Sequence, residues 1–401
     1  MNFREYHAFF PPYAREAVEA LCENGFDAYL VGGCVRDFYM GRSPHDFDIT
    51  TDATSDEIIA CFQKKDKRAC LIGGACGTVG VGDARKGEEI EITPYRTESG
   101  YYDHRHPETV TFVKDISEDL SRRDFTVNSL AVGFDRSGKF GVIDLFGGIR
   151  DIENRVLRCV GDAEKRFDED ALRMLRAVRF AATLNFTVAD ETKSALTEKT
   201  PLLSYVSGER KSTELRKLLC AEAPERVVRA FRPFLSSFLG EIEPNGLDGV
   251  SASFCERLFY LTRGQSERDF SNGVLPLKLS GDELSTLQRL RGIDCQNNRR
   301  GTIASADLAR YLADYGYFTA RYFAVFPSPR GTALLNDRAL PKTLAELSVG
   351  GNELRARGFS GKEIGEALHT LLYECLNGTC KNTSEELLNC AEKLKKGPNE
   401  T

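Results

Sequence analysis

The chain has 401 residues, of which 41% are hydrophobic and 28% are charged, so a disordered or fibrous protein is excluded and roughly two to four domains are expected. Its 54 basic and 60 acidic residues give a formal net charge of −6, which argues against a surface coated with positive charge for indiscriminate binding to nucleic acid or membrane. The N-terminus has no apolar signal segment, no apolar run is long enough to cross a membrane, and none of the twelve cysteines forms a C-x-x-C pair. We therefore expect a reduced protein of the cytoplasm with no membrane partner.

The first 150 residues contain short apolar runs punctuated by glycine, which are typical of β-strands. The clearest runs are 28–33, 109–113 and 129–134, and helical patterns occur near 13–24 and from about Ser55. From about residue 160 onward, apolar residues recur at spacings of three and four, which indicates helices. The sequence thus predicts an α/β part followed by an all-helical remainder.

Two carboxylates follow a glycine turn near the N-terminus. Asp46 and Asp48 are two residues apart in a predicted strand, so both side chains point to one face. Two like charges held that close together require a cation between them. Carboxylate oxygens suit Mg²⁺, whose coordination shell is completed by substrate phosphates. The backbone of Gly32 and Gly33 can approach an anion closely, and Arg36 can donate to phosphate oxygens. The alternative for an isolated D-x-D is a solvated turn.

A third carboxylate is expected on a neighbouring strand if two metal ions are used. Glu89 and Glu91 share one face of the predicted strand 89–92, and their spacing does not distinguish them. The alternative is an exposed strand edge.

Residues 121–128 combine two arginines, an acid and an amide. Arg123 and its neighbour Arg122 supply cations for a triphosphate, whereas Asp124 and Asn128 can bind ribose hydroxyls. The alternative is the charged start of a helix.

Residues 166–180 form a predicted helix on which Asp170 and Arg173 are neighbours on one face. An acceptor beside a donor matches the amine and ring nitrogen of cytosine and adenine. Uracil and guanine present the reverse pattern and would leave both protein groups mispaired. Each unsatisfied buried group would cost about 1–3 kcal/mol of binding free energy. The alternative is an ordinary surface ion pair, worth about 0.2–0.5 kcal/mol.

Residues 286–360 have eleven basic against six acidic residues, with tyrosine and phenylalanine interleaved. Such a mixture suits phosphate contacts and base stacking, and the alternative is a solvated helical surface with core aromatics. The basic residues are Arg289, Arg291, Arg299, Arg300, Arg310, Arg321, Arg330, Arg338, Lys342, Arg355 and Arg357, and the aromatic residues are Tyr311, Tyr315, Tyr317, Tyr322 and Phe323.

Together these blocks resemble the class II bacterial tRNA nucleotidyltransferases, the CCA-adding enzymes of the polymerase-beta-like nucleotidyltransferase superfamily. The resemblance covers nearly the whole chain, and its motifs occur in the family's order. They are GGCVRDFYMGRSPHDFDITTDA from Gly32, RRDFTVNSLA from Arg122, DLFGGIRDI at 144–152, EDALRMLRAVRFAATLNF at 169–186 and SGERKSTELRKLL at 207–219.

The resemblance implies an elongated, multi-domain protein with an α/β nucleotidyltransferase head followed by an all-helical neck, body and tail. The expected bounds are 1–150 for the catalytic head, 151–220 for the neck with the nucleotide-selecting motif, 221–310 for the body and 311–401 for a tail that binds tRNA.

The implied activity is template-independent addition of CMP, CMP and AMP, from CTP and ATP, to the 3′ end of tRNA by two-metal phosphoryl transfer with Mg²⁺. Asp46 and Asp48 would be the metal ligands, and the resemblance favours Glu91 as the third catalytic carboxylate. The implied nucleotide-binding residues are Gly32, Gly33, Arg36, Arg123, Asp124, Asn128, Asp170, Arg173, Arg176 and Arg179.

The segment from Tyr95 to Phe112, which contains Arg105, is similar to the family's flexible loop, which is implicated in the switch from C to A addition. The rival functions are a poly(A) polymerase, an enzyme that adds only CC or only A, and a non-catalytic RNA-binding protein of the same fold. The GTV run from Gly77 argues against the first, and the presence of the loop argues against a CC-only enzyme. The sequence leaves the oligomeric state open.

Overall fold

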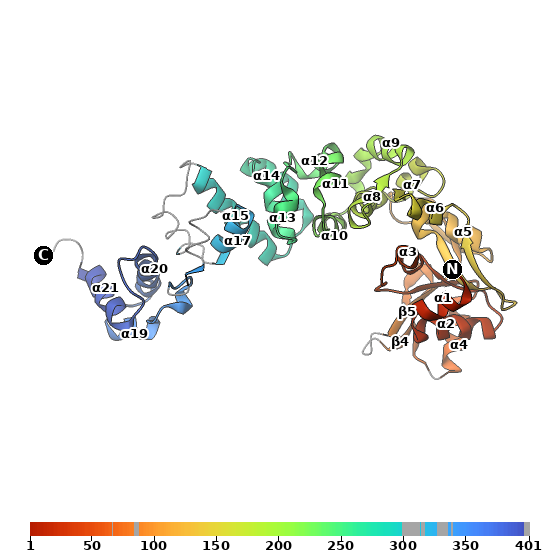
Figure 1. The fold of residues 1–401 in the computed structure, drawn as a ribbon, viewed down its shortest axis with the longest axis horizontal. Helices are drawn as coiled ribbons and strands as arrows, with labels where there is room; N and C mark the ends of the chain where they lie inside the picture. The colour runs from red at the N-terminus through yellow and green to blue at the C-terminus, as the bar shows by residue number, and fades with distance from the viewer. Residues whose placement is uncertain are drawn as a thin grey trace. The chain divides into compact units, whose positions relative to one another are not determined.

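The computed structural model describes residues 1–65, 67–83, 88–298, 313, 317–326, 336–337 and 340–396. The chain divides into two compact units, Met1–Leu218 and Leu219–Thr401 (Figure 1). The four-part division expected from the sequence stays a prediction.

The first unit is built on a seven-stranded mixed sheet with the strand order β3-β4-β5-β2-β1-β8-β9. Strands β2 and β5 are parallel, and the other neighbours are antiparallel. The predicted α/β class of this part is confirmed. The strands are β1 (Ala28–Val31), β2 (Asp48–Thr51), β3 (Ala69–Gly73), β4 (Thr78–Asp83), β5 (Glu88–Pro94), β8 (Leu130–Phe134) and β9 (Phe140–Asp144).

Strand β1 ends two residues earlier than the apolar run 28–33 predicts. Gly32 has φ +79°, a conformation that favours glycine, and it turns the chain directly into helix α3 (Gly33–Tyr39). This early turn places the start of α3 beside the start of β2, where Asp48 is in register with Val31.

Side-chain caps set the starts of two helices in this unit. Asn2 and Glu5 form a capping box on α1 (Phe3–Phe9), and Thr54 and Glu57 form one on α4 (Ser55–Gln63). Two further helices are α2 (Pro12–Glu23) and α5 (Ile116–Ser121).

The predicted flexible loop is an antiparallel ribbon of β6 (Arg96–Ser99) and β7 (Thr109–Phe112). Between the strands, the carbonyl of His104 accepts a hydrogen bond from the amide of Ala171 (3.2 Å). The His104 Nδ1 atom also lies 2.7 Å from the carbonyl oxygen of Asp168. The ribbon therefore contacts the segment that carries Asp170.

The remainder of the chain is mostly helical, but the expectation of an all-helical remainder is wrong in one detail. Strands β10 (Val156–Leu157) and β11 (Thr187–Val188) form a small parallel sheet. These two-residue strands are too short to produce an alternating pattern in the sequence. The neighbouring helices are α6 (Gly148–Glu153), α7 (Ala163–Glu169), α8 (Leu172–Thr183), α9 (Asp190–Glu198) and α10 (Gly208–Leu219).

The second unit contains only helices and short 3₁₀ turns among its described residues. Leu354, Leu371 and Leu387 are fully buried in the core near its C-terminal end. No helix in the described part of the chain is long and apolar enough to cross a membrane. The helices are α11 (Glu225–Ala230), α12 (Arg232–Leu239), α13 (Phe254–Thr262), α14 (Glu267–Val274), α15 (Gly281–Asn298), α17 (Tyr317–Val325), α19 (Gly351–Ala356), α20 (Lys362–Leu376) and α21 (Ser384–Lys396).

Candidate active site

The carboxylates of the predicted metal site lie at and just before the start of β2. The expectation that the strand includes Asp46 is wrong, because β2 begins only at Asp48 and Asp46 precedes it outside any strand. Asp48 is the first residue of β2 and is in register with Glu91 of the parallel strand β5, whereas Glu89 is opposite Gly82 of β4. Partial burial raises the pKa of Asp48 above its ordinary value, and the nearby negative charges of Glu91 and Asp46 act in the same direction. The Asp48 side chain is still reached by solvent, but nearby protein atoms exclude part of the water that would surround the carboxylate. The structure thus brings Glu91 beside Asp48.

The donor set fits Mg²⁺ bound jointly by protein and substrate. Within the described residues, no group of three or more His, Cys, Asp or Glu side chains is gathered closely enough to hold a metal ion by itself. Mg²⁺ is commonly held by one or two carboxylates and by substrate phosphates. The accumulated negative charge at Asp48 is the feature that such an ion would neutralise.

A cavity of about 640 Å³ adjoins these carboxylates, a size typical of small-molecule sites. All of the predicted site residues except Glu91 line it. They are Gly32, Gly33, Arg36, Asp46, Asp48, Arg123, Asp124, Asn128, Asp170, Arg173, Arg176 and Arg179.

Glycine allows close approach to two arginines at one end of this cavity. A Cβ atom on Gly32 would lie 3.4 Å from Arg123 Nη1, and one on Gly33 would lie 3.6 Å from Arg36 Nη2. Arg36 is held in place because it donates to Asn128 Oδ1 (2.7 Å) and to Asp37 Oδ1. This end of the cavity therefore presents oriented guanidinium groups and a bare backbone, which suit a polyphosphate.

Asp124 and Asn128 form a fixed polar pair in the cavity wall. The amide of Asn128 donates to Asp124 Oδ1 (3.2 Å), and Arg176 Nε donates to Asp124 Oδ2 (2.8 Å). Burial alone would raise the pKa of Asp124, but the charge of Arg176 outweighs this effect and holds the pKa below its ordinary value. Asp124 is therefore an ionised acceptor in the cavity wall. The residue lies in a bend of the chain, so the alternative that this block is the charged start of a helix is wrong.

The prediction that Asp170 and Arg173 are paired on one helix is wrong in its geometry. Asp170 lies between α7 and α8 in an extended conformation (φ −139°, ψ 105°), and α8 begins only at Leu172. Arg173 donates to Glu169 Oε2 (2.6 Å). Both predicted residues line the cavity, but each is held by a different partner, because the chain bends at Asp170.

The partner of Asp170 is Arg210 of α10, which the sequence interpretation missed as a site residue. Arg210 Nη2 lies 2.9 and 3.1 Å from the two carboxylate oxygens of Asp170. Arg210 belongs to the motif at 207–219, so the motif was visible in the sequence, although the contact across 40 positions was not.

Phe180 is a second missed member of the cavity wall. The Arg179 guanidinium lies 3.5 Å from the centre of its ring, within the range of a cation–π contact. Arg179 also donates to the buried Glu214 of α10 (2.6 Å). The α8 arginines are thus fixed by packing and by charge before any ligand binds.

The basic segment 286–360 is only partly a candidate RNA surface. Arg291 donates to the carbonyl groups of Thr262 and Gln265, and Arg321 pairs with Glu256. Tyr322 and Phe323 are core residues that are 2% and 4% exposed, so the suggestion that they stack on bases is wrong. The predicted residues Arg299, Arg300, Arg310, Tyr311, Tyr315, Arg330 and Arg338 lie outside the described part of the chain.

Comparisons with known proteins show which family this chain resembles. Residues 28–158 match the model of the poly A polymerase head domain, and residues 185–233 match a probable RNA and SrmB-binding site of polymerase A. The CCA-adding enzyme of Lactobacillus delbrueckii subsp. bulgaricus is 36% identical over 392 residues, which cover 92% of this chain and 94% of that protein. The CCA-adding enzyme of Geobacillus stearothermophilus is 46% identical over 211 residues, covering 52% of this chain and 50% of that protein.

Solved structures show the same fold. The crystal structure of the Bacillus stearothermophilus CCA-adding enzyme in complex with CTP has a TM-score of 0.73 and 29% identity, covering 96% of this chain and 98% of that one. The Thermotoga maritima CCA-adding enzyme complexed with tRNA has a TM-score of 0.73 at 19% identity and covers 98% of both chains. The head domain and its carboxylate-lined cavity define a nucleotidyltransferase. More narrowly, the chain belongs to the family of CCA-adding enzymes.

Proposed function

We propose that this protein adds CMP, CMP and AMP, from CTP and ATP, to the 3′ end of tRNA without a nucleic-acid template. The observation that carries the proposal is the single cavity in which the carboxylates at β2, the arginines near α3 and the Asp170 segment meet. Family membership over nearly the whole chain supports the same activity. We also propose that the enzyme works in the cytoplasm, in keeping with its twelve free thiols.

Asp46, Asp48 and Glu91 are proposed to hold Mg²⁺. When bound, Mg²⁺ would lower the pKa of the attacking 3′-hydroxyl and neutralise charge on the departing pyrophosphate. Arg36 and Arg123 bind and orient the triphosphate so that its α-phosphorus lies before the carboxylates.

Asp124 and Asn128 are proposed to accept and donate hydrogen bonds at the ribose hydroxyls of the incoming nucleotide. Their mutual hydrogen bond and the contact with Arg176 keep both groups in one orientation. Arg176 and Arg179 complete the cavity wall. Little reorganisation is therefore needed when a nucleotide enters.

Asp170 and Arg173 are proposed to select the base by the donor and acceptor pattern of cytosine and adenine. Arg210 orients the acceptor, and Glu169 orients the donor. Both orienting contacts are ion pairs between residues of the protein itself. The protein can therefore select the base of the incoming nucleotide without a template strand.

The test is to incubate the purified protein with tRNA that ends before CCA, supplying CTP and ATP separately and together, and to measure product lengths. Three added residues only with both nucleotides support the proposal. A long A tract with ATP alone would identify a poly(A) polymerase. Arrest after CC with both nucleotides, or addition of A only to tRNA that already ends in CC, would identify a partial enzyme.

A further inference from the structure

A second cavity adjoins Asp48 and Glu91. Its volume is about 280 Å³, and Asp48, Arg122 and Arg123 line both this cavity and the larger cavity described above, which we call the nucleotide cavity. Asp46 lines the nucleotide cavity, whereas Glu91 lines the second one. The carboxylates therefore stand between two cavities.

The proposed reaction has two substrates that must meet at these carboxylates. In-line transfer requires the attacking oxygen and the departing pyrophosphate to lie on opposite sides of the α-phosphorus. If the nucleotide occupies the larger cavity, the attacking hydroxyl must come from the side of Glu91. The second cavity lies on that side.

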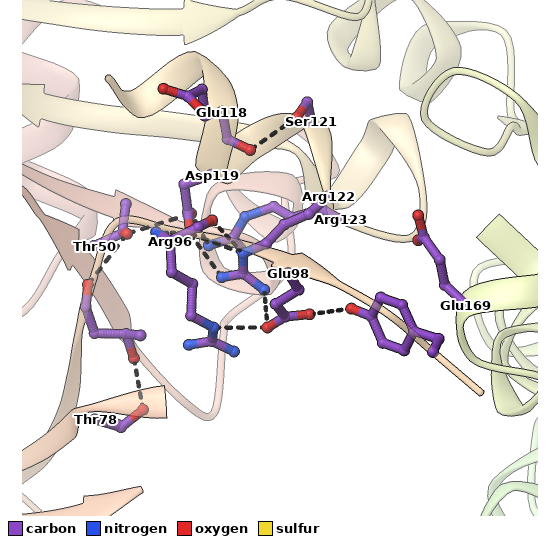
Figure 2. Close-up of polar contacts among 12 residues, drawn as sticks. Thr50, Thr78, Arg96, Glu98, Glu118, Asp119, Ser121, Arg122, Arg123 and Glu169 are labelled. Carbon is purple, nitrogen blue, oxygen red and sulfur yellow. Dashed lines mark hydrogen bonds and ion pairs between the residues drawn. The ribbon is translucent and has the colours of Figure 1, made fainter. Parts of the chain in front are cut away.

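Two threonine hydroxyls in the second cavity bond to each other. Thr78 Oγ1 of β4 lies 3.0 Å from Thr93 Oγ1 of β5 (Figure 2), and both residues line the cavity. Each hydroxyl has one hydrogen, so when one donates to the other, the second hydrogen has no acceptor among the described residues. The pair can therefore donate one hydrogen bond to a ligand.

Arg96 supplies a positive charge in the same cavity. Its Nε donates to Glu98 Oε1 (2.7 Å), and Glu98 is held in turn by Arg122 and Tyr101 (Figure 2). No contact within the described residues uses the two outer nitrogens of Arg96. The guanidinium is fixed but keeps donors for an anion.

We propose that the second cavity binds the terminal ribose of the RNA that is extended, and that the Thr78–Thr93 pair recognises its 2′-hydroxyl. Arg96 holds the adjoining phosphate. A 2′-hydroxyl is both donor and acceptor, and it is the group by which a protein distinguishes RNA from DNA. The proposal rests on the proposed function and assigns the site of its second substrate.

The test compares two tRNAs that end before CCA, one with a terminal ribose and one with a terminal 2′-deoxyribose. The measurement is kcat/KM for CMP addition with respect to each tRNA at saturating CTP. The wild-type protein should prefer the ribose end by about 5- to 100-fold, the range expected for one buried hydrogen bond. The double variant Thr78→Val/Thr93→Val, which removes both hydroxyls, should reduce the preference to about twofold or less and leave the KM for CTP unchanged.

Three further variants separate loss of the hydroxyl from damage to the sheet. Thr93→Ser keeps the hydroxyl and should keep the preference. Thr187→Val, an exposed strand residue of the same unit, should behave as the wild type. If the double valine variant does not fold, Thr78→Ala combined with Thr93→Ala makes the same test.

Equal use of both tRNAs by an active wild-type protein overturns the assignment of the cavity, as does a preference that survives in a folded variant that lacks both hydroxyls. Failure of the wild-type protein to add CMP to the ribose-ended tRNA is a different result, because it contradicts the proposed function itself.

Discussion

Arg210 holds both carboxylate oxygens of Asp170, at 2.9 and 3.1 Å, and so connects helix α10 to the bend between α7 and α8. The contact fixes the acceptor that is proposed to select the base. Under that proposal, base selection depends on a helix that begins 38 positions after Asp170.

Replacement of Arg210 should loosen base selection. We expect Arg210→Met to lower kcat/KM for CTP and ATP by about 10- to 100-fold, the cost of a hydrogen bond to a charged group, and to narrow the discrimination against UTP and GTP. Single-nucleotide incorporation with each triphosphate measures both effects. Lys217→Met on the same helix is the control. Unchanged rejection of UTP and GTP by Arg210→Met would show that Arg210 does not position Asp170.

The third carboxylate can be identified by a matched pair of substitutions on β5. Glu91→Gln should reduce incorporation of both CMP and AMP by about 10³-fold, as expected for loss of several kcal/mol of stabilisation at a metal ligand. Glu89→Gln should remain within about twofold of the wild type, because Glu89 is opposite Gly82 and not Asp48. Binding of tRNA should persist in both variants. The reverse order of activities would assign the role to Glu89.

Asp119 is expected to make the first unit sensitive to acid. It is fully buried and accepts hydrogen bonds from Arg122 (2.7 Å) and Arg123 (3.1 Å), as Figure 2 shows. Burial would raise its pKa, but the two arginines outweigh burial and lower the pKa in the folded state. Its stabilisation is therefore present above the unfolded pKa, about 3.9, and is lost as the pH falls through the lower folded value.

The variant Asp119→Asn tests this expectation. At neutral pH it should lower the free energy of unfolding of the unit by about 3 kcal/mol, because the half-buried Arg123 loses its ion pair and Arg122 keeps only its ion pair with Glu98. The difference from the wild type should shrink as the pH falls below about 4. Urea titrations at several pH values measure it, with the exposed Asp56→Asn as control. A difference that does not depend on pH would contradict the assignment.

The basic residues of the second unit should divide into two kinds. Arg355 is exposed and contacts Asn352, so Arg355→Ala should weaken tRNA binding and reduce the slope of log K against log salt by about 1. Arg321 pairs with the buried Glu256, so Arg321→Ala should destabilise the unit instead. Binding titrations at several salt concentrations and thermal unfolding separate the two effects. An unchanged salt slope in Arg355→Ala would place the RNA elsewhere.

The sequence by itself determined the chemistry at the head of this protein. The D-x-D spacing puts Asp46 within two residues of Asp48 although only Asp48 belongs to β2, and the glycine turn at Gly32 follows from a backbone that needs positive φ. The order of the motifs was enough to indicate the family, because each motif carries its chemistry within a few consecutive residues.

Only the tertiary structure decided which residues meet across the chain. Glu89 and Glu91 share a face, so strand periodicity treats them alike, and the register of β5 against β2 distinguishes them. Helical spacing suggested a pair of Asp170 with Arg173, but the chain bends at Asp170 and brings in Arg210. The local sequence pattern indicates the direction in which a side chain points. Which residue it contacts forty or more positions away depends on how the strands and helices pack.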